Sequence, residues 1–301
     1  MPKTLQPDLR SKQPEQVKPY SPHDPLTHGV DRGRWLFHHL ESALGGSLGR
    51  ELVDIGCGYG GLSIAWANQG KRSIAVEKEP RNVAVVIERL RRGEAAPGCV
   101  TPIIGSALAL PLADKVADLA LMMGVLEWVG YSDPGRQVRD LQLAALKESA
   151  RVLRPGGILA LGTKNRLFPR YVWSDAQLHR PLVNVLPRGF ANWVSTQLWN
   201  LDYRGYVYTY AGWKSLVEAA GFARAEILVP IFNYQFPLVL AKPWRPVKLN
   251  GLCHPGQASE GTRLKALKSG SFGRTAWYRA FGRLGLLGLA AGSFLIVCRR
   301  S

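Results

Sequence analysis

Residues 51–61, ELVDIGCGYGG, decide the fold of this chain. They begin with an apolar segment, residues 52–55, that predicts a short buried strand, and continue into three glycines at alternate positions, Gly56, Gly58 and Gly60. A strand that ends on glycines and leads into a helix makes a tight turn, whose backbone a ligand can approach closely. The G-x-G-x-G spacing differs from the dinucleotide-binding G-x-G-x-x-G. Asp54, just before the first glycine, would repel a pyrophosphate but would accept hydrogen bonds from an ammonium or hydroxyl group.

A second acidic residue follows the glycines at an informative distance. Residues 72–77, RSIAVE, predict another short strand that ends at Glu77, roughly 20 residues beyond the glycines. In a βαβ unit that binds adenosine, an acid at this place accepts hydrogen bonds from the ribose hydroxyls. Residues 80–92 then predict a helix with one apolar face.

VDIGCGYGG, residues 53–61, resembles the first motif of the class I S-adenosylmethionine-dependent methyltransferases, and RVLRPGGILAL, residues 151–161, is typical of the same family. Pro155 is expected to stop a helix, and the two following glycines to turn the chain back into the sheet. The resemblance implies an α/β fold: a Rossmann-like, doubly wound, mostly parallel seven-stranded sheet, with helices on both faces and an aromatic lid inserted after the fifth strand.

The resemblance also implies S-adenosylmethionine as the cofactor and a set of residues that would bind it. This set is Asp54, Gly56, Cys57, Gly58, Gly60, Glu77, Lys78, Ser106, Ala107 and Gly124. Ser106 stands where relatives often have an aspartate that contacts the adenine amine. We therefore expect a weaker contact there.

Two candidates for a catalytic base emerge from the sequence, Glu127 and His179. Glu127 lies in GVLEWV, residues 124–129, which resembles the family's segment after its fourth strand, although Trp128 stands where many relatives have a histidine. A helix-capping or surface role for Glu127 is the alternative. Methyl transfer from a sulfonium depends mainly on holding donor and nucleophile in line, so neither a metal nor a catalytic triad is expected.

Residues 163–210 are aromatic and basic, and they lie where relatives insert a lid over the substrate. Asn165 and Arg166 are expected at the carboxyl end of the fifth strand, where open α/β sheets bind ligands. With Tyr171 and Tyr208 they are the candidate substrate-binding residues. A second small core is the alternative for most aromatic residues of this segment.

The sequence predicts a domain organisation with a proline-rich, disordered segment at residues 1–27 and a methyltransferase domain at residues 28–301. The domain would comprise a cofactor-binding half, a lid and a C-terminal half; these are residues 51–162, 163–210 and 211–301, the last with a basic excursion at about 242–273. The apolar run 284–298 is too short for a membrane span of about 20 residues. WYRAFGR, residues 277–283, could contact a membrane surface, but core packing is favoured.

The chain has 301 residues and a net charge of +17, of which residues 241–301 contribute eleven Lys and Arg against a single acid. Such a tail fits an anionic partner or a solubilising surface equally well. The four cysteines show no disulfide or zinc spacing, and a cytoplasmic protein is predicted.

Three functions follow from these observations. A methyltransferase acting on a small-molecule, sugar or lipid-head-group acceptor is favoured, because an aromatic lid suits a compact substrate. An RNA or protein methyltransferase is the second, supported by the positive charge but weakened by the lack of an Asn-Pro-Pro-Tyr tetrad after the fourth strand. An inactive cofactor-binding scaffold is the third, and Asp54, the glycines and Glu77 argue against it.

Overall fold

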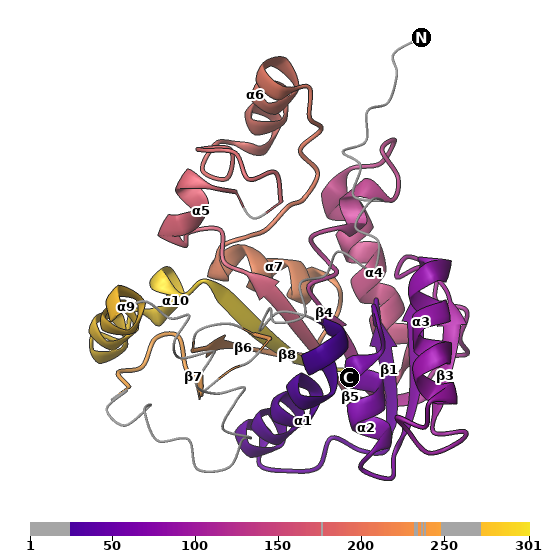
Figure 1. Ribbon diagram of the computed structural model, residues 1–301. Coiled ribbons are helices and arrows are strands. Elements are labelled where there is room, and N and C mark those ends of the chain that lie inside the picture. The colour runs from indigo at the N-terminus through magenta and orange to yellow at the C-terminus, as the bar shows by residue number, and fades with distance from the viewer. Residues whose placement is uncertain (1–24, 176, 232–233, 236, 238, 248–271) are drawn as a thin grey trace.

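The computed structural model describes residues 25–175, 177–231, 234–235, 237, 239–247 and 272–301 (Figure 1). Within these residues the chain forms one sheet of eight strands, in the order β3-β2-β1-β4-β5-β8-β6-β7. The strands are β1 (Glu51–Ile55), β2 (Arg72–Glu77), β3 (Val100–Ile104), β4 (Ala117–Met123), β5 (Leu153–Lys164), β6 (Arg224–Pro230), β7 (Leu240–Ala241) and β8 (Ser293–Arg299).

The sheet is mixed. Strands β3, β2, β1, β4 and β5 are parallel to one another, whereas β8 runs antiparallel to both β5 and β6, and β7 runs antiparallel to β6. The predicted α/β architecture is confirmed, but the predicted count of seven strands is wrong for the described residues. The additional strand, β7, consists of two residues that pair with the end of β6, and so short a strand has no periodicity that a sequence could show.

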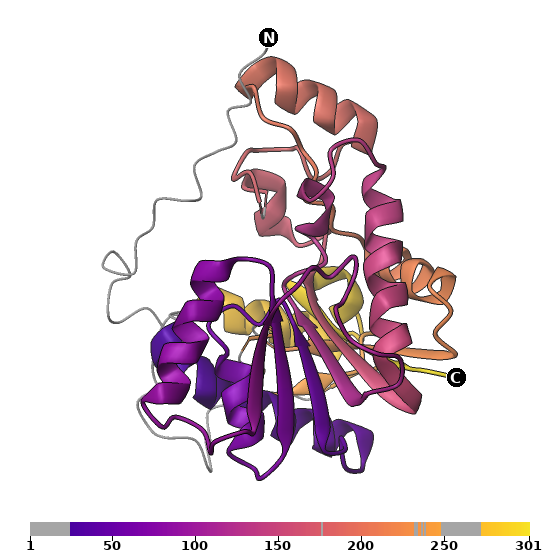
Figure 2. The ribbon, with the colours of Figure 1, turned by 90° about the vertical axis from the view of Figure 1, so that its right-hand side faces the viewer.

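Helices cover both faces of the sheet, as Figure 2 shows. The helices are α1 (Pro25–Leu44), α2 (Gly61–Ala67), α3 (Pro80–Arg91), α4 (Val138–Val152), α5 (Pro169–Trp173), α6 (Arg188–Trp199), α7 (Tyr210–Ala219), α9 (Phe272–Arg283) and α10 (Leu287–Ala290), with a 3-10 turn at Val129–Tyr131. None of the described helices is long and apolar enough to cross a membrane.

Strand β4 shows how the sequence produces this layering. Leu119 and Leu121 belong to the core cluster beneath α1 and α2, whereas Ala120 and Met122 belong to the cluster beneath α4 and α7. All four side chains are fully buried. A strand covered by helices on both faces reads as a continuous apolar run, because both sets of alternating side chains are removed from water.

The motif RVLRPGG, residues 151–157, has a different backbone structure from the one predicted. Helix α4 ends at Val152, and β5 begins at the next residue, before Pro155 is reached. Along β5 the pairing with β4 shifts from Ala117–Leu153 to Leu119–Ile158. The proline and the glycines therefore form a bulge inside the strand, where Gly156 has a φ of 77°.

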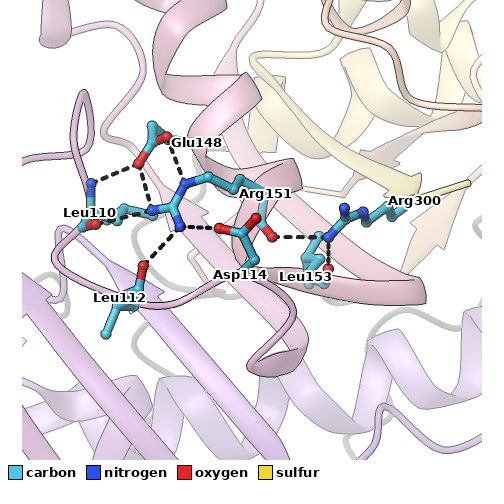
Figure 3. A network of polar contacts seen from close by, with 7 residues as sticks. All are labelled: Leu110, Leu112, Asp114, Glu148, Arg151, Leu153 and Arg300. Atoms are coloured by element: carbon cyan, nitrogen blue, oxygen red, sulfur yellow. Dashed lines mark hydrogen bonds and ion pairs between the residues drawn. The ribbon is translucent and has the colours of Figure 1, made fainter.

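Arg151 in the same motif holds the loop that follows β3 (Figure 3). Its guanidinium donates to the carbonyl oxygens of Leu110 and Leu112 at 3.0 and 2.8 Å, and forms ion pairs with Glu148 and Asp114 at 2.9 and 2.7 Å. Glu148 in turn accepts the Leu110 N–H at 2.9 Å. This network ties the carboxyl end of α4 to the loop that carries Ser106 and Ala107, and the motif thus has a structural role.

Replacing Arg151 with methionine should destabilise the fold by about 1–3 kcal/mol, because two carbonyl oxygens and two carboxylates lose a shared charged donor. The free energy of unfolding in urea measures this loss. Arg92→Met is the matched control, since Arg92 makes an exposed ion pair with Glu88 and its removal should cost less than about 0.5 kcal/mol. Equal effects of the two substitutions would contradict this role for Arg151.

The segment after β5 forms a small unit of its own. In Figures 1 and 2, α5 and α6 stand clear of the sheet, at the end where β5 leads into α5. Val183, Ala191 and Tyr203 form a separate buried cluster there. The second small core expected as an alternative is therefore present, while the covering of a substrate by this segment stays a prediction.

Two parts of the predicted domain organisation fall outside the described residues. These are residues 1–24 of the proline-rich segment and residues 248–271 of the basic excursion. Of the predicted disordered segment, residues 25–27 belong to α1.

Candidate functional site

The glycine loop lies at the carboxyl end of β1 and leads into α2. Gly56, Gly58 and Gly60 all have positive φ, of 69°, 56° and 73°, a region that residues with a side chain rarely adopt. A Cβ on Gly56 would lie 2.5 Å from a Val125 methyl, whereas a Cβ on Gly58 would meet nothing within 4 Å. The loop is thus packed on one side and has open space beside Gly58.

Glu77 secures this loop from the neighbouring strand. Its carboxylate accepts the Gly58 N–H at 2.9 Å, and also the N–H groups of Lys78 and Glu79 at 2.9 and 3.2 Å. The side chains of Lys78 and Glu79 are exposed. Lys78 therefore contributes its backbone to this arrangement, and the carboxylate of Glu77 joins the ends of β1 and β2.

Asp54 is buried at the end of β1, and its Oδ2 accepts a hydrogen bond from the Ser63 hydroxyl at 2.8 Å. Burial raises the pKa of Asp54 to about 6. The hydrogen bond from Ser63 and the charge of Arg32 oppose this shift, and the charge of Glu77 adds to it. Because Asp54 interacts electrostatically with Arg32 and Glu77, the three charged groups lie in one neighbourhood.

Arg32 and Tyr234 are site residues that the sequence analysis missed. Arg32 comes from α1 and interacts electrostatically with Asp54 and Tyr234; its Nε is buried without a hydrogen-bond partner in the described part of the chain. The close packing of α1 on α2 brings it there: a Cβ on Gly61 would lie 2.6 Å from the backbone of Gly29. Paired glycines on the two helices were the available signal.

Tyr234 reaches the site from the loop after β6. Its hydroxyl oxygen is 2.5 Å from the position that a Cβ on Gly124 would take. Its ring is 2.6 Å from the position that a Cβ on Gly162 would take. Burial raises the pKa of this hydroxyl, and the charge of Glu127 raises it further. The ends of β4 and β5 therefore carry glycine because a tyrosine from a distant loop packs on them.

Glu127 is buried, at 1% exposure, so the surface alternative for it is wrong. Its Oε2 is 3.4 Å from the Thr163 hydroxyl, and its Oε1 is buried without a hydrogen-bond partner among the described residues. Burial raises the pKa of Glu127, and the charge of Lys164 opposes that shift.

The remaining predicted cofactor residues follow the carboxyl ends of β1, β3 and β4. Cys57 donates its N–H to the Val76 carbonyl at 3.1 Å, and its half-buried thiol has a pKa raised by burial. Ser106 and Ala107 follow β3, and the Ser106 hydroxyl accepts the Leu108 N–H at 3.2 Å. Gly124 has a φ of 76°.

The predicted substrate residues are engaged inside the protein. The buried Asn165 amide donates to the Ala291 carbonyl at 2.8 Å, and its oxygen accepts the Leu167 N–H at 3.1 Å. Arg166 donates to two carbonyl oxygens, those of Asn184 and Leu186, at 2.5 and 2.7 Å. These contacts join the segment after β5 to α10 and to its own interior. The assignment of Asn165 and Arg166 to substrate stays a prediction.

The aromatic candidates lie in the same segment. Tyr208 donates its hydroxyl to Gln142 Oε1 at 2.8 Å. Tyr171 packs edge-on against Phe168, with ring centroids 5.3 Å apart, and interacts electrostatically with Tyr234. Of the four predicted substrate residues, Tyr171 is the one for which the structure shows an interaction with the group around Tyr234.

His179 is exposed and has a φ of 56°. It follows a turn in which its N–H donates to the Asp175 carbonyl at 3.1 Å. The described residues provide no side-chain hydrogen bond to it. The structure thus buries one of the two predicted bases, Glu127, and exposes the other.

The raised pKa of Asp54 makes a prediction for stability. Since the folded-state pKa of about 6 exceeds the ordinary value of 3.8, the folded state binds the proton more tightly, and this group lowers stability as the pH rises from 4 to above 6. Asp54→Asn removes the titration. Its free energy of unfolding relative to the wild type should therefore rise by about 3 kcal/mol over that range.

Asp118 provides the control. Although burial opposes it, the N–H groups of Arg50 and Glu51 and the Arg154 side chain hold the pKa of Asp118 below its ordinary value. The difference in stability between Asp118→Asn and the wild type should therefore change by less than about 0.5 kcal/mol between pH 4 and 7. A flat difference for Asp54→Asn over the same range would refute the raised pKa.

Part of the chain is similar to known proteins. Residues 53–161 match the family described as methyltransferase domain. The chain is 33% identical over 115 residues to the malonyl-[acyl-carrier protein] O-methyltransferase of Serratia marcescens, covering 38% of each chain. It is 31% identical over 145 residues to the ubiquinone biosynthesis O-methyltransferase of Parvibaculum lavamentivorans, covering 47% of this chain and 50% of the relative.

The aligned part spans half or less of the length of these two relatives. Among solved structures, an S-adenosylmethionine-dependent methyltransferase of Thermotoga maritima is 18% identical, with a TM-score of 0.47 and 92% of both chains covered.

Proposed function

Because residues 53–161 belong to the methyltransferase-domain family, we propose that this protein transfers a methyl group from S-adenosylmethionine to a small-molecule, sugar or lipid-head-group acceptor. One observation carries the proposal: Asp54 and Glu77 flank a glycine loop that has open space beside Gly58. A ligand with hydroxyl groups and a cationic portion suits two carboxylates and a bare backbone.

The residues around the loop fit the parts of this cofactor. Three N–H bonds leave the Glu77 carboxylate with room for a ribose hydroxyl, since a carboxylate has about four acceptor positions. Asp54 would accept from the ammonium group of the methionine portion. Arg32, with its unpartnered Nε, would bind the carboxylate of the same portion. Affinity should rise as the pH rises through about 6, because the ionised form of Asp54 binds the ammonium.

The bound cofactor would supply a methyl group carried on a sulfonium, whose sulfur would keep the bonding electrons when the acceptor atom takes the methyl carbon. A hydroxyl acceptor also loses a proton. Glu127 would take it, because its Oε1 is buried without a hydrogen-bond partner among the described residues and because burial raises its pKa, which makes its carboxylate a stronger base. The exposed His179 lacks such surroundings.

The acceptor would lie among Tyr234, Thr163 and Tyr171. Tyr234 and Thr163 are buried, and Tyr171, from the segment after β5, lies close enough to Tyr234 for its charge to raise the pKa of the Tyr234 hydroxyl. Buried aromatic and hydroxyl groups suit a compact acceptor better than a polymer, because such a site excludes water around the reacting atoms.

Replacing Glu77 with glutamine should weaken S-adenosylmethionine binding about tenfold or more, because a neutral amide is a poorer acceptor for ribose hydroxyls and for the three N–H groups. Isothermal calorimetry measures the dissociation constant. Glu79→Gln is the matched control: this side chain is exposed two residues away, and its loss should leave binding unchanged. If the wild-type protein bound neither S-adenosylmethionine nor S-adenosylhomocysteine, the proposed methyltransferase activity would be refuted.

Glu127→Gln should retain cofactor binding but lose at least about 100-fold in turnover with a hydroxyl acceptor, because the proton then has no carboxylate to accept it. The acceptor is first identified by incubating the wild type with methyl-labelled S-adenosylmethionine and a host-cell extract. His179→Gln should change turnover little. Full activity of Glu127→Gln on a hydroxyl acceptor would exclude Glu127 as the base.

A further inference from the structure

The segment after β5 exposes an unusual amount of apolar surface. Within residues 167–198, seven large apolar side chains are exposed, Trp173, Leu198 and Trp193 most strongly at 75%, 67% and 58%. The other members are Leu167, Leu182, Val185 and Phe190. Single exposed apolar residues are ordinary, whereas exposed apolar side chains gathered in one patch mark an interaction surface, and Phe190 and Trp193 are gathered in this way.

Helix α6 shows that this exposure is organised. Its inner face buries Ala191 and Ser195 over the small core of Val183 and Tyr203. Phe190 and Trp193, one turn apart, lie on the outer face, and their rings stack with centroids 5.5 Å apart. Figures 1 and 2 show that α6 stands away from the sheet. The helix thus packs by Ala191, Ser195 and Trp199 and exposes Phe190 and Trp193 to solvent.

The charges of the segment point to the nature of the partner. Arg170 and Arg180 are exposed, and Arg180 also lies over the Trp199 ring, 5.7 Å from its centroid. Asp175 is fully buried and accepts two backbone N–H groups, so among the described residues 165–207 the exposed acid is Asp202.

The other three arginines of the segment form hydrogen bonds within the protein. Arg166, Arg188 and Arg204 donate to backbone carbonyl oxygens of the protein itself. Apolar contact therefore dominates over charge. A nucleic acid would demand the opposite balance, because phosphate contacts provide most of its affinity.

We propose that the α5–α6 segment docks the protein on an anionic lipid bilayer. Trp173, Phe190 and Trp193 would enter the interface between head groups and acyl chains, where amphipathic aromatic rings are most stable. Arg170 and Arg180 would face the anionic head groups. The docking does not depend on the proposed methyl transfer.

The position of the segment adds a consequence that does rest on the proposed function. β5 leads into α5 at the end of the sheet where Thr163 and the neighbouring Glu127 lie. A bilayer held against α5 and α6 would present an amphiphilic acceptor close to these groups. The acceptor class is then a membrane-resident lipid whose polar end carries the methylated atom.

The docking is tested with the full-length chain and sedimentation of lipid vesicles, either of phosphatidylcholine alone or with about one third phosphatidylglycerol. We expect the wild type to bind both, and the anionic vesicles more tightly. The double substitution F190S/W193S should lower the partition coefficient about tenfold on both. R170S/R180S should lower binding to the anionic vesicles about tenfold and leave binding to phosphatidylcholine vesicles unchanged.

The matched control is L284S/L289S, which removes two exposed leucines at α10 and its preceding turn and should leave binding unchanged. Circular dichroism verifies that each variant folds. As a second readout, brominated lipid should quench the tryptophan fluorescence of the wild type, and W173F/W193F should reduce that quenching without abolishing binding.

Three results would overturn the docking. The wild type does not sediment with vesicles; F190S/W193S sediments as the wild type does; or F190S/W193S converts an oligomer into a monomer on a sizing column, which would make this surface an interface between copies of the chain. Glu77→Gln should bind vesicles like the wild type, so failure of the enzyme and failure of the docking are distinguishable.

Discussion

The hydrogen bond from the Gly58 N–H to the Glu77 carboxylate is the contact on which the candidate site depends. It links the glycine loop after β1 to the end of β2. The N–H groups of Lys78 and Glu79 donate to the same carboxylate. Left-handed glycines have no side chains to fix their conformation, so an external acceptor must do so. The carboxylate of Glu77 therefore fixes the conformation of the loop independently of any ligand.

The second half of the site is assembled by close packing between segments far apart in the chain. Arg32 reaches Asp54 because α1 and α2 touch through glycine, and Tyr234 reaches Glu127 because Gly124 and Gly162 leave space for its ring and hydroxyl. Each approach relies on a missing Cβ. The glycines outside the loop thus contribute to the site as much as those within it, since they determine which side chains can converge.

Much of the fold was predictable from residues 51–161, because strands buried on both faces and helices with one apolar face leave distinct periodicities. The buried environment of Glu127 and the place of Tyr234 were not predictable, since tertiary contacts create them, and only the glycines of α1 and α2 gave a signal for the place of Arg32. The bulge at Pro155 and Gly156 was misread as a turn for a related reason: both start with the same residues, and only pairing with β4 distinguishes them. The resemblance to class I methyltransferases is confirmed.

The family match ends within β5, before the residues that we propose to bind the acceptor. Asp54, Glu77 and the glycine loop lie within residues 53–161, whereas Thr163, Tyr171 and Tyr234 lie beyond them. The matched part uses backbone N–H groups and short motifs, which survive when the rest of the chain diverges. The groups beyond it are single side chains on loops and on an added segment, which can change without disturbing the sheet. A cofactor site within the matched part and a proposed acceptor site beyond it are consistent with functions that differ on one fold, and the exposed aromatic residues of α6 also lie beyond the matched part.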